Sequence, residues 1–178
     1  MSRTSAFKWR WPRKRWLRLL LEIGLVAALY LGLSAWQRRH LLSAQAPAPA
    51  LRLLGLDGRE HSLAELRGKA VLLHFWAPWC GVCKMEFSSL TSLERNLPRD
   101  TVLWSVVADA TDRAQIERFV LEHDIRYPVL LADEATIARF RVTSFPTNYY
   151  LDQNGVVQQT TIGMSSRASM WLRLWLVR

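Results

Sequence analysis

The chain has 178 residues, of which 50% are hydrophobic and 22% are charged, and its formal net charge is +9. Nine Lys and Arg residues stand against one acid in residues 1–40, whereas fifteen stand against fourteen in residues 41–178. Because the basic excess is confined to the N-terminus, the composition argues against a nucleic-acid partner.

Residues 1–18 have the composition of a basic cytoplasmic segment that flanks a membrane. Seven cations precede the first apolar run, and three tryptophans lie among them. Cations suit the anionic cytoplasmic leaflet, and tryptophans suit the interface between lipid and water. The eighteen residues from Leu19 to Trp36 contain one charge, Glu22. As a helix they extend about 27 Å, close to the thickness of a bilayer's hydrocarbon core. We therefore predict one transmembrane anchor over residues 19–37.

The charges around this span predict its orientation. Only Arg38 and Arg39 follow it closely, so the positive-inside bias places the N-terminus in the cytoplasm and the remaining chain in the periplasm of a bacterial inner membrane. A cleaved signal peptide is the alternative, since Ala44-Gln45-Ala46 resembles a cleavage site. We favour a retained anchor, because the apolar run is longer than a signal peptide's usual one. Residues 38–50, with Pro47 and Pro49, are then expected to form a short linker.

Residues 51–178 have the length of one domain. Hydrophobic periodicity and turn residues predict its elements. In chain order they are strands at 51–54 and 60–63 around a type I′ turn at Asp57-Gly58, a buried strand at 71–76, a helix at 80–96, a strand at 102–108, a helix at 112–123 capped by Thr111, a strand at 129–131, a helix at 133–140, strands at 147–151 and 156–162 around Asn154-Gly155, and a helix at 166–177. This order of a parallel β-α-β unit, an antiparallel hairpin and a final helix predicts a thioredoxin-like, three-layer α/β sandwich with a central mixed sheet.

The only two cysteines, Cys80 and Cys83, lie two residues apart where the buried strand meets the following helix. A C-x-x-C pair in this position indicates a redox site. The first sulfur would lie at the positive end of the helix dipole, which favours a thiolate. We predict that Cys80 attacks and that Cys83 resolves, with the Cys80–Cys83 disulfide as the redox-active group, no further cofactor and no metal.

Three segments resemble the membrane-anchored thioredoxin-like proteins of the TlpA/ResA class: residues 71–84, Phe145-Pro146-Thr147 and the Asn154-Gly155 hairpin. The extra strand and helix between Asn96 and Thr143 match an insertion of that class. The Arg-rich start, the Gly81-Val82 dipeptide and the closing residues 171–176 are most similar to the suppressor-for-copper-sensitivity D type, a group of protein disulfide oxidoreductases.

The resemblance implies a substrate groove beside the cysteines. Pro146 would be cis and face the Cys80 sulfur, and Phe145 would pair with the backbone of a partner protein. Trp79 would lie on the rim of this groove rather than in the core.

The chain departs from the family at the positions that support the cysteines. His74 stands where thioredoxins hold a buried Asp and many relatives an Asn; it could accept a proton from Cys83, but we favour a neutral, hydrogen-bonded core histidine. Glu86 matches a frequent family Glu, and we interpret it as a solvated acid in the first turn of a helix. Asp109 and Asp112 are weak candidates for the acid that relatives carry after the second strand, and both are also suited to beginning a helix.

These features predict a membrane-tethered periplasmic thiol-disulfide oxidoreductase that exchanges disulfides with protein partners through Cys-Gly-Val-Cys. The resemblance favours a role in copper or oxidative stress and a membrane electron-transfer partner, whereas the direction of electron flow stays open. Two alternatives remain: a cytochrome c maturation thiol reductant of the same fold, and a Cu(I)-binding module that uses both thiolates.

Overall fold

The computed structural model describes residues 13–38 and 41–178, in two compact units that divide between Gln37 and Arg38. Residues 1–12 of the predicted basic segment and residues 39–40 of the predicted linker lie outside the described residues.

The first unit is a single helix, α1 (Arg13–Arg38). Its stretch Trp16–Leu33 is long and apolar enough to cross a membrane and has no buried residue. The helix predicted over residues 19–37 is therefore confirmed as a helix. A signal sequence near the N-terminus can meet the same criterion of length and hydropathy.

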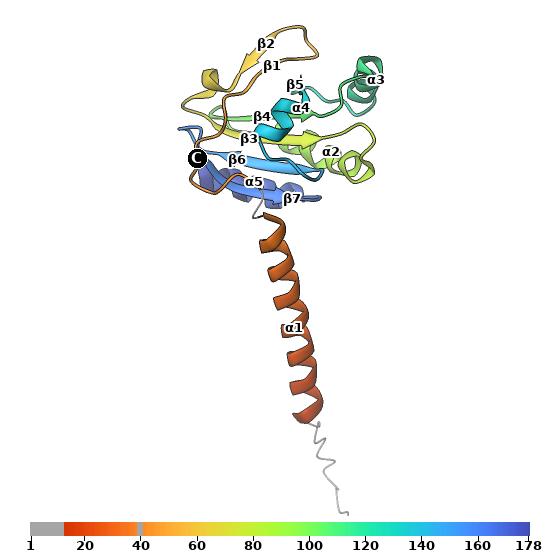
Figure 1. Ribbon diagram of the computed structural model, residues 1–178, viewed down its shortest axis with the longest axis vertical. Helices are drawn as coiled ribbons and strands as arrows, with labels where there is room; N and C mark the ends of the chain where they lie inside the picture. Colours follow the sequence, from red (N-terminus) through yellow and green to blue (C-terminus); the bar gives the residue numbers. More distant parts are fainter. Residues whose placement is uncertain (1–12, 39–40) are drawn as a thin grey trace, which may run out of the picture. The chain divides into compact units, whose positions relative to one another are not determined.

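A five-stranded mixed sheet forms the centre of the second unit, with the strands in the order β5-β4-β3-β6-β7 (Figure 1). Its strands are β3 (Ala70–Trp76), β4 (Thr101–Val107), β5 (Val129–Leu131), β6 (Thr147–Leu151) and β7 (Val157–Ile162). The pairs β3–β4 and β4–β5 are parallel, whereas β3–β6 and β6–β7 are antiparallel. The predicted mixed sheet is confirmed.

Both faces of the sheet are covered, which explains why every residue of β3 is buried and all but His74 are apolar. One face packs against α2 (Gly81–Glu94), α3 (Arg113–Glu122) and α5 (Arg167–Val177), whose buried side chains share a core with Leu72 and Trp76. The other face packs against α4 (Glu134–Arg139) and the N-terminal hairpin, in a core with Leu73 and Phe75. These three layers confirm the predicted thioredoxin-like sandwich.

The N-terminal hairpin pairs β1 (Arg52–Leu54) with β2 (Glu60–Ser62), and a short 3-10 helix, η1 (Leu63–Leu66), follows it. The predicted type I′ turn is wrong. Gly55 and Arg59 close the turn through a 2.8 Å backbone hydrogen bond, so the loop has three residues instead of two. Only Gly58 of the pair Asp57-Gly58 has a positive φ, 77°, whereas a type I′ turn needs two.

The predicted linker of residues 38–50 is wrong for residues 41–50, which pack on the domain. Leu41 is 2% exposed and belongs to the core on the β1–β2 side of the sheet. Residues 45–48 run beside the start of β7, where Gln45 N donates to Val157 O and Val157 N donates to Ala46 O. These backbone bonds hold the segment in place despite its two prolines.

Asp112, and not Thr111, is the N-cap of α3: its carboxylate accepts a hydrogen bond from Gln115 N at 2.9 Å. Asp133 caps α4 in the same way. An aspartate at an N-cap satisfies a backbone N–H that the helix itself leaves unpaired.

Candidate redox site

The two cysteines form a disulfide at the start of α2, which follows directly from the carboxyl end of β3. Cys80 is the N-cap residue of α2, and its sulfur accepts a hydrogen bond from Cys83 N at 3.1 Å. Cys80 is 7% exposed, whereas Cys83 has no exposed surface. Of the two cysteines, only Cys80 has exposed surface that a partner can contact.

The position of Cys80 favours negative charge on its sulfur. The N-terminus of a helix carries a partial positive charge, and here a backbone N–H also points at the sulfur. Both interactions are stronger with a thiolate than with a thiol. The arrangement suits Cys80 as the attacking or leaving sulfur in disulfide exchange.

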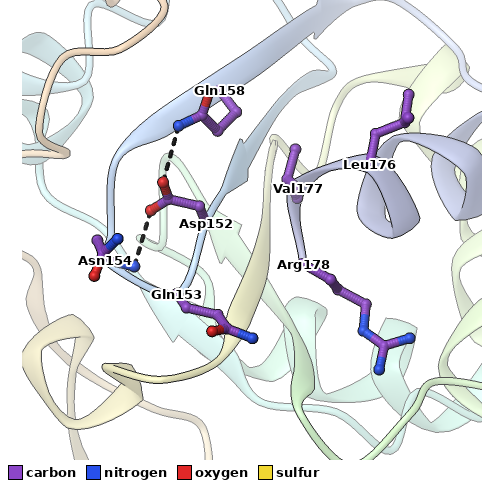
Figure 2. A pocket seen from close by; sticks show the side chains of 7 residues that line it. All are labelled: Asp152, Gln153, Asn154, Gln158, Leu176, Val177 and Arg178. Atoms are coloured by element: carbon purple, nitrogen blue, oxygen red, sulfur yellow. Dashed lines mark hydrogen bonds between the residues drawn. The ribbon is translucent and has the colours of Figure 1, made fainter.

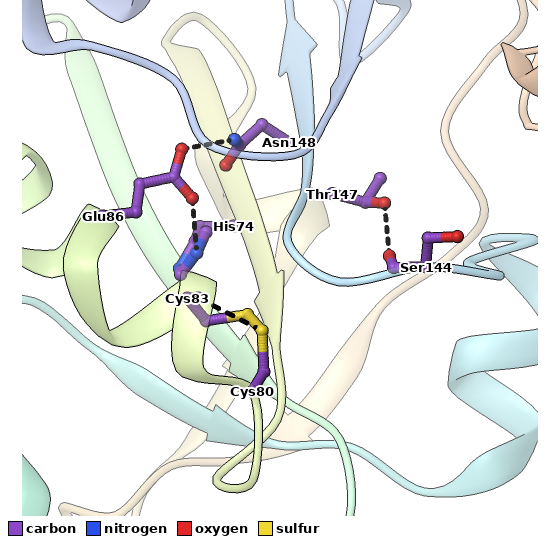
Figure 3. The surroundings of a disulfide bond; sticks show 7 residues. All are labelled: His74, Cys80, Cys83, Glu86, Ser144, Thr147 and Asn148. Carbon is purple, nitrogen blue, oxygen red and sulfur yellow. Dashed lines mark hydrogen bonds and ion pairs between the residues drawn. A yellow bond between two sulfur atoms is a disulfide. The ribbon is translucent and has the colours of Figure 1, made fainter.

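Three polar side chains with no exposed surface lie around the disulfide: His74 of β3, Glu86 of α2 and Asn148 of β6 (Figure 3). His74 Nε2 lies 3.3 Å from Glu86 Oε2, within ion-pair range but without the alignment of a hydrogen bond. The other carboxylate oxygen, Oε1, accepts from Asn148 Nδ2 at 3.1 Å and from Ser165 N at 2.8 Å. Four separate segments of the chain thus meet at one buried carboxylate.

The interpretation of Glu86 as a solvated acid is wrong. It lies on the inward face of α2, where a buried carboxylate needs hydrogen bonds or a cation to offset lost hydration. His74 is buried, as predicted for a core histidine, but the predicted hydrogen bond is wrong, because neither ring nitrogen has a hydrogen-bond partner among the described residues. Asn148 was not predicted as part of the site. The feature of the sequence that could have indicated it is an amide side chain within the short strand TNYYL, all of whose residues are buried.

The predicted groove residues meet beside the cysteines. The Phe145–Pro146 peptide bond is cis, as the resemblance implies. The rings of Trp79 and Phe145 pack edge to face, with centroids 5.7 Å apart. Trp79 is 68% exposed, which excludes the core interpretation of this residue.

The two weak acidic candidates have local roles. Asp112 caps α3, as described above, and Asp109 accepts a hydrogen bond from Thr111 Oγ1 at 2.8 Å. Neither is among the residues around the disulfide in Figure 3.

A pocket of about 250 Å³ lies where the β6–β7 turn meets the C-terminal end of α5 (Figure 2). Asp152 on its wall accepts hydrogen bonds from Asn154 N and Gln158 Nε2. The pocket has no cysteine in its lining and is separate from the redox pair.

Comparison with known proteins agrees with this geometry. The model of the AhpC/TSA family matches residues 44–160. The thioredoxin-like protein YneN of Bacillus subtilis is 30% identical over 167 residues, which cover 90% of this chain and 97% of that protein. The thiol-disulfide oxidoreductase ResA of Bacillus cereus is 30% identical over 156 residues, which cover 85% of this chain and 88% of that protein.

A solved structure has the same fold. The thiol:disulfide interchange protein of the thioredoxin family from Chlorobium tepidum superposes with a TM-score of 0.69 at 24% identity, over 76% of this chain and 98% of that chain. The family model and the two relatives show that the chain belongs to the AhpC/TSA family, and within it to the thioredoxin-like thiol-disulfide oxidoreductases.

Proposed function

We propose that this protein is a membrane-tethered thiol-disulfide oxidoreductase whose domain faces the periplasm and exchanges disulfides with protein partners. The observation that carries the proposal is the asymmetry of the pair. Cys80 reaches the surface at the N-cap of α2, whereas Cys83 is fully buried behind it. A cysteine that a partner can contact is suited to attack, and a buried cysteine behind it is suited to resolve the mixed disulfide.

In the reducing direction the Cys80 thiolate attacks a partner disulfide, forms a mixed disulfide and releases one partner sulfur as a thiolate. Cys83 then loses its proton and attacks the Cys80 sulfur. The Cys80–Cys83 disulfide forms and the second partner sulfur leaves. Two electrons pass from the cysteine pair to the partner, whose two sulfurs take up protons. Oxidation of a partner dithiol is the same sequence in reverse.

His74 and Glu86 are proposed to handle the Cys83 proton in this cycle. His74 Nδ1 is buried and has no hydrogen-bond partner within the described residues while Cys83 is in the disulfide. Figure 3 shows the His74 ring between the Glu86 carboxylate and Cys83. When the disulfide is reduced, Cys83 gains an S–H group that can donate a hydrogen bond, and then its proton, to His74 Nδ1. Glu86 would then offset the positive charge on the imidazole.

A histidine variant tests this role. We expect His74→Asn to slow resolution of the mixed disulfide and to remove one step from the pH dependence of the exchange rate. His123→Gln is the matched control, because His123 is a partly buried histidine outside the surroundings of the disulfide. An unchanged pH profile in His74→Asn would leave His74 as a packing residue only.

The exposed Trp79 ring, packed on Phe145 next to Pro146, is proposed as the wall that a partner polypeptide contacts. The resemblance supports backbone pairing at Phe145. Trp79→Ala is expected to raise KM for a protein disulfide more than it lowers kcat, since it removes binding surface and leaves both sulfurs in place.

Retention of the anchor is supported by the core of the domain. Leu41, which is 2% exposed, precedes the candidate cleavage site Ala44-Gln45-Ala46. Cleavage there would remove this buried side chain and part of the segment that pairs with β7. The excess of cations before the span supports an N-terminus in the cytoplasm.

Similarity to the copper-sensitivity D type supports a reduced working state in copper or oxidative stress, fed by a membrane electron donor. The first experiment is the reduction potential of the Cys80–Cys83 pair, by equilibration with glutathione. A value at or below about −200 mV supports a reductant, whereas one near about −120 mV makes the protein an oxidant.

Trapping of partners tests the exchange itself. In cells, Cys83→Ser should accumulate mixed disulfides, because the attacking sulfur remains and the resolving sulfur is gone, whereas Cys80→Ser should accumulate none. The absence of trapped species would count heavily against exchange with proteins. Stoichiometric Cu(I) binding by the reduced form, lost in Cys80→Ser, would then favour the copper-binding alternative.

A further inference from the structure

The C-terminal helix α5 is apolar on two opposite sides. Met170, Leu174 and Val177 face the core and are buried. The opposite side carries Trp171, Leu172, Trp175 and Leu176, which are between 48% and 58% exposed. We call these four residues the outer α5 face.

Helix geometry makes these four side chains one surface. Trp171 and Trp175 are four residues apart, as are Leu172 and Leu176, so each pair lies on the same side of the helix. At about 100° per residue, the four lie within about 140° of arc, on the far side from the buried residues. Large contiguous apolar surfaces of this kind mark an interaction site on a soluble domain.

The charges that α5 itself carries are all positive. Arg167 and Arg173 lie on α5 and Arg178 follows it, and the helix contains no acidic residue. Arg178 is paired with Asp100 at 2.7 Å, while Arg167 is exposed. Tryptophan and leucine on one side of a helix with arginines beside them match the surface of an anionic bilayer, where rings lie at the headgroups and cations meet phosphate.

The tether brings that surface within reach. In the sequence, two residues separate Arg38, where α1 ends, from the buried Leu41, so the chain that joins the anchor to the folded domain is short. This step rests on the proposed membrane tether. A domain held so close meets the headgroup region continuously, whereas a free protein partner must arrive by diffusion.

We propose that the outer α5 face lies in the headgroup interface of the membrane that carries the anchor. This contact would attach the domain to the membrane at a second point, besides the anchor, and would thereby orient the redox site. Trp171 and Trp175 line a pocket with Leu97 and Pro98, just beyond the C-terminal end of α2. Cys80 lies at the other end of this 14-residue helix, about 21 Å away. Attachment through the outer α5 face would therefore leave about the length of α2 between these two tryptophans and Cys80, the residue that soluble protein partners contact.

The test places a nitroxide label in the full-length protein, in a Cys80→Ser Cys83→Ser background, reconstituted at one copy per nanodisc of phosphatidylcholine and phosphatidylglycerol. The labelled variants are Leu172→Cys and Leu176→Cys on α5. Leu121→Cys is the matched control, because Leu121 is an 81% exposed leucine on α3. Leu25→Cys reports insertion of α1. Collision rates with oxygen and with a water-soluble nickel chelate give the depth of each label.

The expected result is a several-fold lower nickel collision rate and a higher oxygen collision rate at 172 and 176 than at 121. Labels at 172 and 176 that match 121 while the label at 25 lies in lipid would overturn the inference and leave the tether intact. Protection from both reagents would mean that protein covers the face, which also overturns it. A label at 25 that lies in water would refute the tether, and with it the geometry on which this inference depends.

Discussion

The surroundings of Cys83 and the outer face of α5 both reverse the usual distribution of side chains. His74, Glu86 and Asn148 are polar and have no exposed surface, whereas Trp171, Leu172, Trp175 and Leu176 are large, apolar and about half exposed. Burial of a carboxylate costs free energy that only specific partners offset, and exposure of tryptophan forgoes the gain from burying it. Neither arrangement is the one that the stability of an isolated domain would favour by itself. We have proposed proton transfer as the role of the first region and membrane contact as the role of the second.

The largest expected effect on stability is at the buried carboxylate. Glu86→Ala should lower the free energy of unfolding by about 3–5 kcal/mol, because it leaves His74, Asn148 and the Ser165 N–H without their partner. Urea unfolding of the oxidised protein measures the loss. Glu86→Gln keeps the size and one acceptor oxygen, so its loss should be smaller. A loss below about 1 kcal/mol in Glu86→Ala would show that the region does not depend on this carboxylate.

The two sides of α5 give the next largest contrast. Leu174→Ala removes a 2% exposed side chain from the core and should cost about 2–5 kcal/mol. Leu172→Ala, two residues earlier and 50% exposed, should change the stability of the detergent-solubilised protein by no more than about 0.5 kcal/mol. Equal losses in the two variants would mean that the outer α5 face is a structural surface.

The stability of the domain at alkaline pH should depend on its buried tyrosines. Burial raises the pKa of Tyr149 and of Tyr150 to about 12. The ordinary tyrosine pKa is about 10, so above pH 10 the unfolded chain loses protons that the folded chain keeps, and stability falls as the pH rises. The contribution of these two tyrosines to the free energy of unfolding is complete below pH 10 and is lost progressively between pH 10 and about 12.

The measurement is urea unfolding at several pH values above neutrality. Tyr150→Phe removes one of these two groups, so the free energy of unfolding should fall less steeply with pH, by the contribution of that one tyrosine. A decline that begins well below pH 10, or that Tyr150→Phe leaves unchanged, would contradict this cause.

The smallest effect is expected at an exposed ion pair, which serves as the reference for Glu86. Arg113 Nε lies 2.7 Å from Glu117 Oε1 on the surface of α3. Glu117→Ala should cost about 0.3–0.5 kcal/mol at low salt and nothing measurable in about 1 M salt, where charges are screened beyond about 3 Å. A loss comparable with that of Glu86→Ala would remove the contrast between buried and exposed carboxylates.

Local patterns predicted the elements of the domain well. The expected strand 71–76 is apolar except for His74, and the observed strand is Ala70–Trp76. The helix expected from Cys80 begins at Gly81 with Cys80 as its cap. These elements depend on residues close in the chain. The turn type at Asp57-Gly58 was predicted wrongly, because the dipeptide marks a turn whereas pairing of Gly55 with Arg59 sets the length of the loop.

The partners of Glu86 were beyond local patterns. An acid in the first turns of a helix is usually solvated. Cys83, Leu90 and Leu93 recur at helical spacing on the side of α2 that holds Glu86, which indicates that this side faces the sheet but does not identify the partners of the carboxylate. Asn148 lies 62 positions and Ser165 lies 79 positions along the chain from Glu86, so only the folded arrangement of β6 and the loop before α5 brings them together. Residues 41–50 were also beyond local patterns. Their prolines predicted a linker, whereas backbone hydrogen bonds to β7, far along the chain, make them part of the domain.

The sequence by itself determined the position of the redox pair, the order of strands and helices, the α1 helix and the family resemblance, because each depends on short-range spacing and composition. The tertiary structure decided which polar groups surround Cys83 and which side of α5 is buried. A helix that is apolar on opposite sides does not reveal which side meets the core. That choice follows from long-range packing on the sheet, which buries Met170, Leu174 and Val177 and leaves the outer α5 face exposed.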